Sequence, residues 1–264
     1  MKKIKYILSF LLSIALYSCI DTEEKIVINA DESGTYTFTI DMGKLIEMAN
    51  QFTPDSLRSD KPKEKKDTII YFKSMIDTSQ SLTTQEKELY KDGYLKMNMD
   101  EANGKMKIEM GCPFKNSNQL TLVKNNFFKV ADKLNLFNKT KDKSLGDLGD
   151  GADAADKGFD DKNINPIGDA ATFTATPGKI SNTISMTDEM KKGLLNDSTI
   201  MMMQQMTMMT GDMTYRTVIM LPKSPKVYEG PGKSLSADGK TVNFSFTLTD
   251  MLEKPENGSY KIEY

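Results

Sequence analysis

Two alternating runs of apolar and polar residues, joined by Asn103-Gly104, restrict the fold of this 264-residue chain more than any other feature. Leucine, methionine and isoleucine occupy every second position in residues 95–99 and again in residues 106–110. A period of two places these side chains on one face of a β-strand. Asn-Gly between two such runs favours a tight turn, because both residues tolerate positive φ angles. The segment therefore predicts an antiparallel hairpin with one buried face.

The same alternation predicts further strands along the chain. Aromatic and β-branched residues alternate with threonine in residues 35–40, which is typical of a half-buried strand. Pro177-Gly178 and Asp238-Gly239 mark turns beside other strand-like segments. The other predicted strands are residues 26–30, 172–176, 179–185, 213–221, 242–248 and 260–264.

Apolar residues at helical spacing predict helices between these strands. The clearest helix is residues 117–136, in which apolar residues recur every three or four positions and share one face. Residues 68–77, 83–89 and 187–210 also predict helices, the last with an interruption near 193–198. We therefore expect an α+β fold with two layers: antiparallel sheet or sheets built from hairpins, with helices packed on one face.

The N-terminus resembles a bacterial lipoprotein signal peptide over residues 1–18. Three lysines within the first five residues precede an apolar run, Tyr6 to Leu16, which is too short to span a bilayer. Leu16 and Ser18 fit the lipobox before Cys19, although Tyr17 is bulkier than the usual residue. We expect cleavage before Cys19 and a lipid anchor on that cysteine. The alternative is an ordinary cleaved signal in which Cys19 has no special role.

Three regions are expected after the signal peptide. Residues 19–25 predict a polar tether, whose acids resemble the export tracts of surface lipoproteins or form a plain linker. Residues 26–264 predict a single α+β domain, interrupted by a flexible insert at 138–169 that is rich in glycine and aspartate. Aspartates recur every third residue within the insert, but their spacing does not fit an EF-hand, so calcium is not expected.

The composition excludes several kinds of catalysis. The chain has no histidine, which removes Ser-His-Asp and Cys-His catalysis and histidine-based zinc sites. It has only two arginines, and without residues 1–18 it would carry 32 basic and 37 acidic residues, which argues against nucleic acid as a partner. We therefore expect no enzyme, cofactor or metal site. The remaining enzymatic alternative is a pair of carboxylates in a cleft, for which the sequence offers no motif.

Sulfur-containing residues are the other unusual feature. Cys112 continues the apolar row of residues 106–110, which favours a small buried hydrophobe over a reactive thiol. Seven of the nineteen methionines lie in segment 201–213. Core or adaptable packing is the favoured reading of this segment. An exposed docking surface is the second reading, and a Cu(I) site in which Met202 shares a helical face with Met206 or Met209 is the third.

Several pieces of the sequence together resemble an uncharacterised family of Bacteroidetes lipoproteins. They are the lipobox at Cys19, Gly34 to Phe38 leading to Asp41-Met42, the methionine-rich stretch before Tyr215, Leu221-Pro222-Lys223, and Leu235 to Val242. More distantly, the opening strand and helix and the proline-terminated strand before an Asp-Gly turn are similar to mycobacterial LppM-type lipoproteins. This resemblance implies an α+β domain with lipid contact and assigns no functional residue.

These observations predict a non-enzymatic lipoprotein of the cell envelope. We expect it to be held through Cys19 at a membrane, the outer membrane on its periplasmic or surface face, where it binds or scaffolds an envelope protein or lipid. The alternative is a module that binds an apolar ligand or lipid. Its pocket would lie between the methionine-rich helix and the sheet, and exposed apolar area along 201–213 would favour docking.

Overall fold

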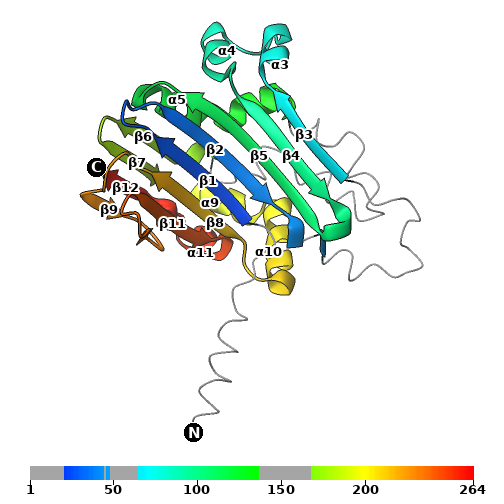
Figure 1. The fold of residues 1–264 in the computed structure, drawn as a ribbon. Coiled ribbons are helices and arrows are strands. Elements are labelled where there is room, and N and C mark those ends of the chain that lie inside the picture. The colour runs from blue at the N-terminus through cyan, green and yellow to red at the C-terminus, as the bar shows by residue number, and fades with distance from the viewer. Residues whose placement is uncertain (1–20, 45, 48–64, 137–167) are drawn as a thin grey trace.

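The computed structural model describes residues 21–44, 46–47, 65–136 and 168–264, and these form two β-sheets with several helices (Figure 1). The predicted signal peptide, Cys19 and residues 138–167 of the predicted insert lie outside the described residues. The first sheet, called the large sheet, has eight strands in the order β10-β11-β8-β1-β2-β5-β4-β3. The second, called the small sheet, has four strands in the order β6-β7-β12-β9. The α+β class predicted from the sequence is confirmed.

The strand bounds agree with most of the alternating segments. The large sheet contains β1 (Asp21–Ile28), β2 (Gly34–Asp41), β3 (Lys65–Tyr71), β4 (Tyr94–Asp100), β5 (Lys105–Phe114), β8 (Thr214–Met220), β10 (Ser234–Leu235) and β11 (Thr241–Thr247). The small sheet contains β6 (Ala171–Thr176), β7 (Lys179–Ile184), β9 (Val227–Glu229) and β12 (Tyr260–Glu263).

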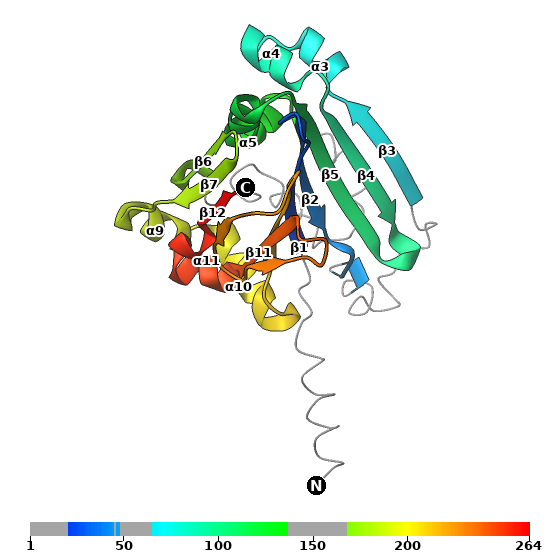
Figure 2. The same ribbon diagram turned by 60° about the vertical axis from the view of Figure 1, so that its left-hand side comes forward.

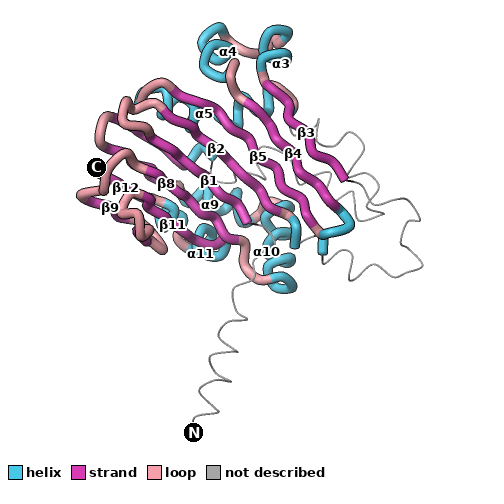
Figure 3. The backbone as a smooth tube through the Cα atoms, in the orientation of Figure 1, coloured by secondary structure: helices cyan, strands magenta, loops and turns pink. Residues whose placement is uncertain are grey.

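The helices lie at the ends of the large sheet and over one of its faces. They are α3 (Lys73–Thr78), α4 (Thr84–Tyr90), α5 (Ser117–Lys133), α9 (Asp188–Leu195), α10 (Ser198–Thr210) and α11 (Leu248–Glu253), with short 3-10 turns η2 (Glu101–Asn103), η3 (Gly168–Ala170) and η4 (Pro255–Gly258). Figure 3 shows α3 and α4 beyond one end of β3 and β4, and α10 near the opposite end of the sheet. The split of the predicted helix 187–210 into α9 and α10 follows the interruption expected near 193–198.

The hairpin formed by β4 and β5 confirms the leading sequence signal. Met97 pairs with Ile108 and Met99 with Met106, so the alternating apolar side chains share the buried face of the sheet. Gly104 closes the turn with a φ of 58°, a left-handed conformation that glycine adopts without strain. The turn is longer than a two-residue loop, because η2 precedes this glycine.

Helix α5 covers the inner face of the large sheet. Its first turn is capped by Asn116, whose side chain accepts a hydrogen bond from the Gln119 main-chain N–H at 3.0 Å. Phe127 meets Tyr36 of β2 edge to face, with ring centroids 4.9 Å apart, and the Phe128 ring meets Phe38 in the same way at 4.8 Å. These contacts hold the helix over β2 and bury its apolar stripe.

The small sheet and α5 together cover the inner face of the large sheet. Figure 2 shows β6, β7 and β12 on the same side of the large sheet as this helix. Phe173 of β6 and Ile262 of β12 belong to one continuous core with Phe244 and Ile219 of the large sheet. The predicted layer of helices is therefore a mixed layer of helix and strands. The phenol ring of Tyr260 stacks on Phe244 at 4.8 Å and joins the two sheets.

Two local predictions were wrong, and in both cases strand pairing is the cause. The predicted tether 19–25 overlaps β1, which begins at Asp21 and pairs antiparallel with β2 and parallel with β8. Its polar composition concealed a central strand. Residues 68–77, predicted as a helix, divide into the end of β3 and the start of α3, because β3 pairs with β4 along its whole length.

Candidate ligand-binding cavity

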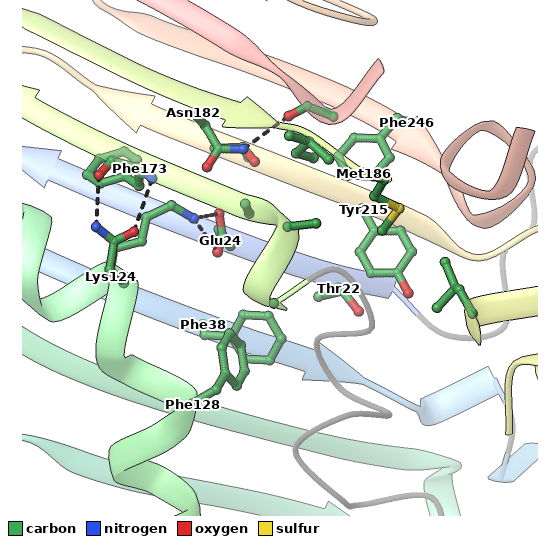
Figure 4. Close-up of a pocket in the computed structure, with 18 of the residues that line it drawn as sticks. Thr22, Glu24, Phe38, Lys124, Phe128, Phe173, Asn182, Met186, Tyr215 and Phe246 are labelled. Carbon is green, nitrogen blue, oxygen red and sulfur yellow. Dashed lines mark hydrogen bonds and ion pairs between the residues drawn. The ribbon is translucent and has the colours of Figure 1, made fainter. Parts of the chain in front are cut away.

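A cavity of about 550 Å³ lies between the inner face of the large sheet and the layer that covers it. This volume lies within the usual range for small-molecule sites in proteins. Its floor comes from β1, β2, β8 and β11, and its walls come from α5, β6, β7, α9 and the start of α10. Figure 4 shows side chains from these elements around the same space.

Aromatic and aliphatic side chains supply most of the wall. Phe38 and Phe128 line one side, where their edge-to-face contact joins β2 to α5. Tyr215 and Phe246 line the floor and stack at 5.4 Å with nearly parallel rings. The opposite wall consists of Ile184, Met186, Met190, Leu194 and Ile200. Such a lining favours apolar or amphiphilic molecules.

A nearly buried ion pair lies at one end of the cavity. The Lys124 ammonium on α5 contacts both carboxylate oxygens of Glu24 on β1, at 2.6 and 2.5 Å. The two side chains are only 10% and 20% exposed, so solvent screens their attraction little. The Tyr36 hydroxyl also donates a hydrogen bond to Glu24 Oε1 at 2.8 Å. The carboxylate is thus held from two sides.

Two aromatic rings also lie next to the Lys124 ammonium. Lys124 Nζ lies 5.6 Å from the centroid of the Tyr36 ring and 5.3 Å from that of Phe173, distances at which cation–π attraction acts. Burial, and then the charge of Glu24, raise the pKa of the Tyr36 phenol well above its usual value. Tyr36 therefore remains a hydrogen-bond donor to Glu24 throughout the physiological pH range.

The wall formed by β6 is attached to α5 by side-chain hydrogen bonds. The Asn125 amide donates to the Phe173 carbonyl at 2.9 Å and accepts from the Phe173 N–H at 3.0 Å. The Thr121 hydroxyl accepts from the Ala175 N–H at 2.8 Å. These bonds replace strand pairing along this edge of β6 and fix the distance between helix and sheet. The cavity is consequently bounded on this side by a wall with little freedom to move.

The residues singled out from the sequence lie mostly away from the cavity. Cys112 is buried in the core below α4, as predicted, and burial raises the pKa of its thiol to about 12, with a smaller effect of Asp92. Cys19 lies outside the described residues. Among the residues that the structure describes, no group of three or more Cys, Asp or Glu is placed to hold a metal ion. The non-enzymatic character of the protein stays a prediction.

The methionine-rich segment 201–213 divides between packing and exposure. Met213 is buried with Leu248 and Met251 in a second small cluster, which Met203 joins from α10. Met201 and Met208 are exposed instead, Met208 to 86%. The side chains of Met202, Met206 and Met209 lie outside the described residues, so the structure does not test the alternative reading of this segment as a Cu(I) site.

Sequence reasoning missed Glu24 and Lys124, although both carry a recognisable signal. Lys124 follows Leu120 by four residues and precedes Phe127 by three, so it interrupts the apolar face of α5. Glu24 is two residues before Ile26 and shares the inner face of β1 with it. A charge on each of two buried faces indicates a pair, because an unpaired buried charge is costly.

Comparison with known proteins gives little further guidance. No family model and no curated protein matches this sequence. Among solved structures, the NMR structure of the folded domain of LppM from Mycobacterium tuberculosis aligns with 94% of this chain and 91% of that chain, at 7% identity and a TM-score of 0.36. At this score the two folds differ too much for residues of one to be placed on the other. The resemblance to Bacteroidetes lipoproteins stays a hypothesis.

Proposed function

We propose that this protein is a lipid-anchored binding module of the cell envelope that holds an apolar or amphiphilic ligand in the cavity. The observation that carries the proposal is the space of about 550 Å³ between the large sheet and α9 and α10, lined mainly by aromatic and aliphatic side chains. Apolar groups gain free energy when they leave water for apolar surroundings. A ligand that enters the cavity would place its apolar part against these side chains. The scaffolding role favoured by the sequence alone stays a prediction.

The position of the proposed anchor fits this role. Only Ile20 separates Cys19 from the start of β1, where Asp21 pairs with Thr214. Thr214 follows closely on α10, so the anchored end of the sheet lies beside this helix (Figure 1). We place α10 and its exposed Met201 and Met208 towards the bilayer, since exposed apolar side chains beside an anchor favour contact with lipid. No helix in the described part of the chain is long and apolar enough to cross a membrane itself.

Binding of an environment-sensitive apolar dye tests the proposal. N-phenyl-1-naphthylamine should bind the processed chain, residues 19–264, saturably and with increased fluorescence. Ala171→Phe should fill part of the cavity, because Ala171 lines it on the inward face of β6 and aromatic side chains suit strands. We expect this variant to bind the dye about tenfold more weakly, which corresponds to about 1.4 kcal/mol.

Thr172→Phe is the matched control for this experiment. Thr172 is the next residue of β6, and its side chain is on the exposed face of the strand. This variant adds the same ring outside the cavity and should bind the dye like the unmodified protein. Equal weakening in both variants, or no saturable binding in the unmodified chain, would contradict the proposal. Thermal unfolding of each variant confirms that the comparison is made between folded proteins.

A further inference from the structure

Three nearly buried polar side chains line the cavity and have hydrogen-bonding capacity left over. Thr22 and Thr217 are 8% and 5% exposed, and within the described residues neither hydroxyl has a protein partner. Asn182, 7% exposed, donates its amide N–H to the Gly258 carbonyl at 3.2 Å, which leaves its Oδ1 without a described partner (Figure 4). Their polar atoms still reach the cavity, whereas the fully buried side-chain polar atom without a partner in the described part of the chain is the Tyr260 hydroxyl, which does not line it. Polar atoms in such sites normally form hydrogen bonds, so these three groups are open to a polar molecule that enters the cavity.

The strand register places two of these groups beside the ion pair. Thr217 lies directly opposite Glu24 in the parallel pairing of β8 with β1, and Thr22 is the next inward residue of β1. Lys124 uses two of its three N–H donors on Glu24, which leaves one donor for a ligand. This end of the cavity therefore offers both donors and acceptors. The opposite wall is formed mainly by apolar side chains such as Met190 and Leu194, and it also includes Asp197.

The charges around this polar end compensate one another. The acids Glu24 and Asp197 and the bases Lys124 and Lys129 of the lining balance in number, while the Arg216 side chain points to the outer face of β8, where it lies 3.5 Å from the carboxylate of Glu23. A carboxylate head beside Glu24 would meet a like charge in a poorly solvated site, and an ammonium head beside Lys124 would do the same. An uncharged head that donates and accepts hydrogen bonds meets neither cost.

We propose that the ligand is an uncharged amphiphile whose head carries hydroxyl and carbonyl groups, of the chemical class of a monoacylglycerol. This inference rests on the proposed function of the cavity. The head bonds to Thr22, Thr217 and Asn182 beside the Glu24–Lys124 pair. The chain of the amphiphile extends between the large sheet and the side chains of α9.

Titration calorimetry with three amphiphiles of equal chain length tests the head group. The probes are monolauroylglycerol, laurate and dodecylammonium, each below its micellar concentration, and the protein is the processed chain, residues 19–264. We expect monolauroylglycerol to bind at least about tenfold more tightly than either ion, because a head charge would lose its hydration without a free counter-charge. Laurate or dodecylammonium binding as tightly as the glyceride overturns the inference and leaves the proposed function standing.

Removal of single hydroxyls locates the head. Thr217→Val keeps the shape of the side chain and should weaken monolauroylglycerol binding about three- to tenfold, the effect of one buried hydrogen bond, while laurate binding stays unchanged. Thr35→Val, on the outer face of β2, is the matched control and should change neither. Equal glyceride affinity in Thr217→Val and the unmodified chain overturns the inference. Failure of all three amphiphiles and of N-phenyl-1-naphthylamine overturns the proposed function as well.

Discussion

The Glu24–Lys124 pair gives the sharpest quantitative prediction, because both side chains are nearly buried and contact each other at hydrogen-bond distance. Lys124→Met removes the ammonium, keeps most of the apolar stem, and leaves the Glu24 carboxylate with only the Tyr36 hydroxyl. Glu24→Gln keeps the shape of the side chain and leaves the ammonium without a counter-charge. Removing one partner of a buried pair costs about 3–5 kcal/mol, since the other charge remains buried and uncompensated.

The surroundings decide where in that range each variant falls. Lys124→Met also loses the attraction of the ammonium to the rings of Tyr36 and Phe173, about 2 kcal/mol for a desolvated cation, although the methionine sulfur regains part of it. We expect a loss of about 3 kcal/mol in the free energy of unfolding for either single variant. The double variant Glu24→Gln with Lys124→Met buries no charge and should lose about 1 kcal/mol. The coupling energy of the cycle is then about 5 kcal/mol.

Urea unfolding followed by far-ultraviolet circular dichroism measures these values, since the chain has no tryptophan to report by fluorescence. The matched control is the pair Glu23–Arg216, which also starts from β1 but joins it to β8 at 3.5 Å, and whose side chains are 35% and 48% exposed. Its coupling should not exceed about 1 kcal/mol, as for other solvated pairs. Coupling of the buried pair as small as that of the exposed pair would refute the reasoning.

Two further predictions concern the thiol and the anchored end. Burial raises the pKa of the Cys112 thiol from 9.0 to about 12, so the stability that this thiol contributes is complete below pH 9 and falls as the pH rises towards 12. Between pH 7.5 and 10, the free energy of unfolding should fall by about 1.4 kcal/mol more in the unmodified chain than in Cys112→Ala. Urea unfolding that shows the same pH dependence for both proteins would contradict this. Met208→Asp should weaken binding of the processed, unacylated chain to neutral phospholipid vesicles about fivefold in a flotation assay. The control is Ile69→Asp, which changes an exposed side chain on the edge strand β3 and should leave vesicle binding unchanged. Equal weakening by the two substitutions would refute the proposed orientation of α10.

Local sequence signals predicted the hairpins and helices well because the contacts that fix them are close in the chain. Asn103-Gly104 closes β4 and β5, and Pro177-Gly178 joins β6 to β7. Helix α4 begins with a capping box between Thr83 and Glu86, three residues apart. In each case one short segment contains both the strand or helix and the residues that set where it begins or ends.

Pairing between distant segments could not be predicted in the same way. Residues 29–213 separate β1 from β8, and no turn or spacing in the sequence specifies that the two strands lie parallel and side by side. The assignment of residues 19–25 as a tether failed for this reason, since its acids look solvated until Lys124 and Arg216 are placed beside them. The cavity depends on the same pairing and was predicted only as a general position between the methionine-rich helix and the sheet.

The register of β1 and β8 explains why the cavity lies at this end of the sheet. In the middle of the β1–β8 pairing, Ile26 lies opposite Ile219, both side chains are 0% exposed, and the core is continuous there. The next inward pair is Glu24 with Thr217, and the one after that is Thr22 with Tyr215. A sheet face that served packing alone would stay apolar under its covering layer, because each buried polar group without a partner costs about 1–3 kcal/mol. The change from isoleucine to polar residues therefore coincides with the start of the cavity, which lies between the main core and the second apolar cluster that Tyr215 joins.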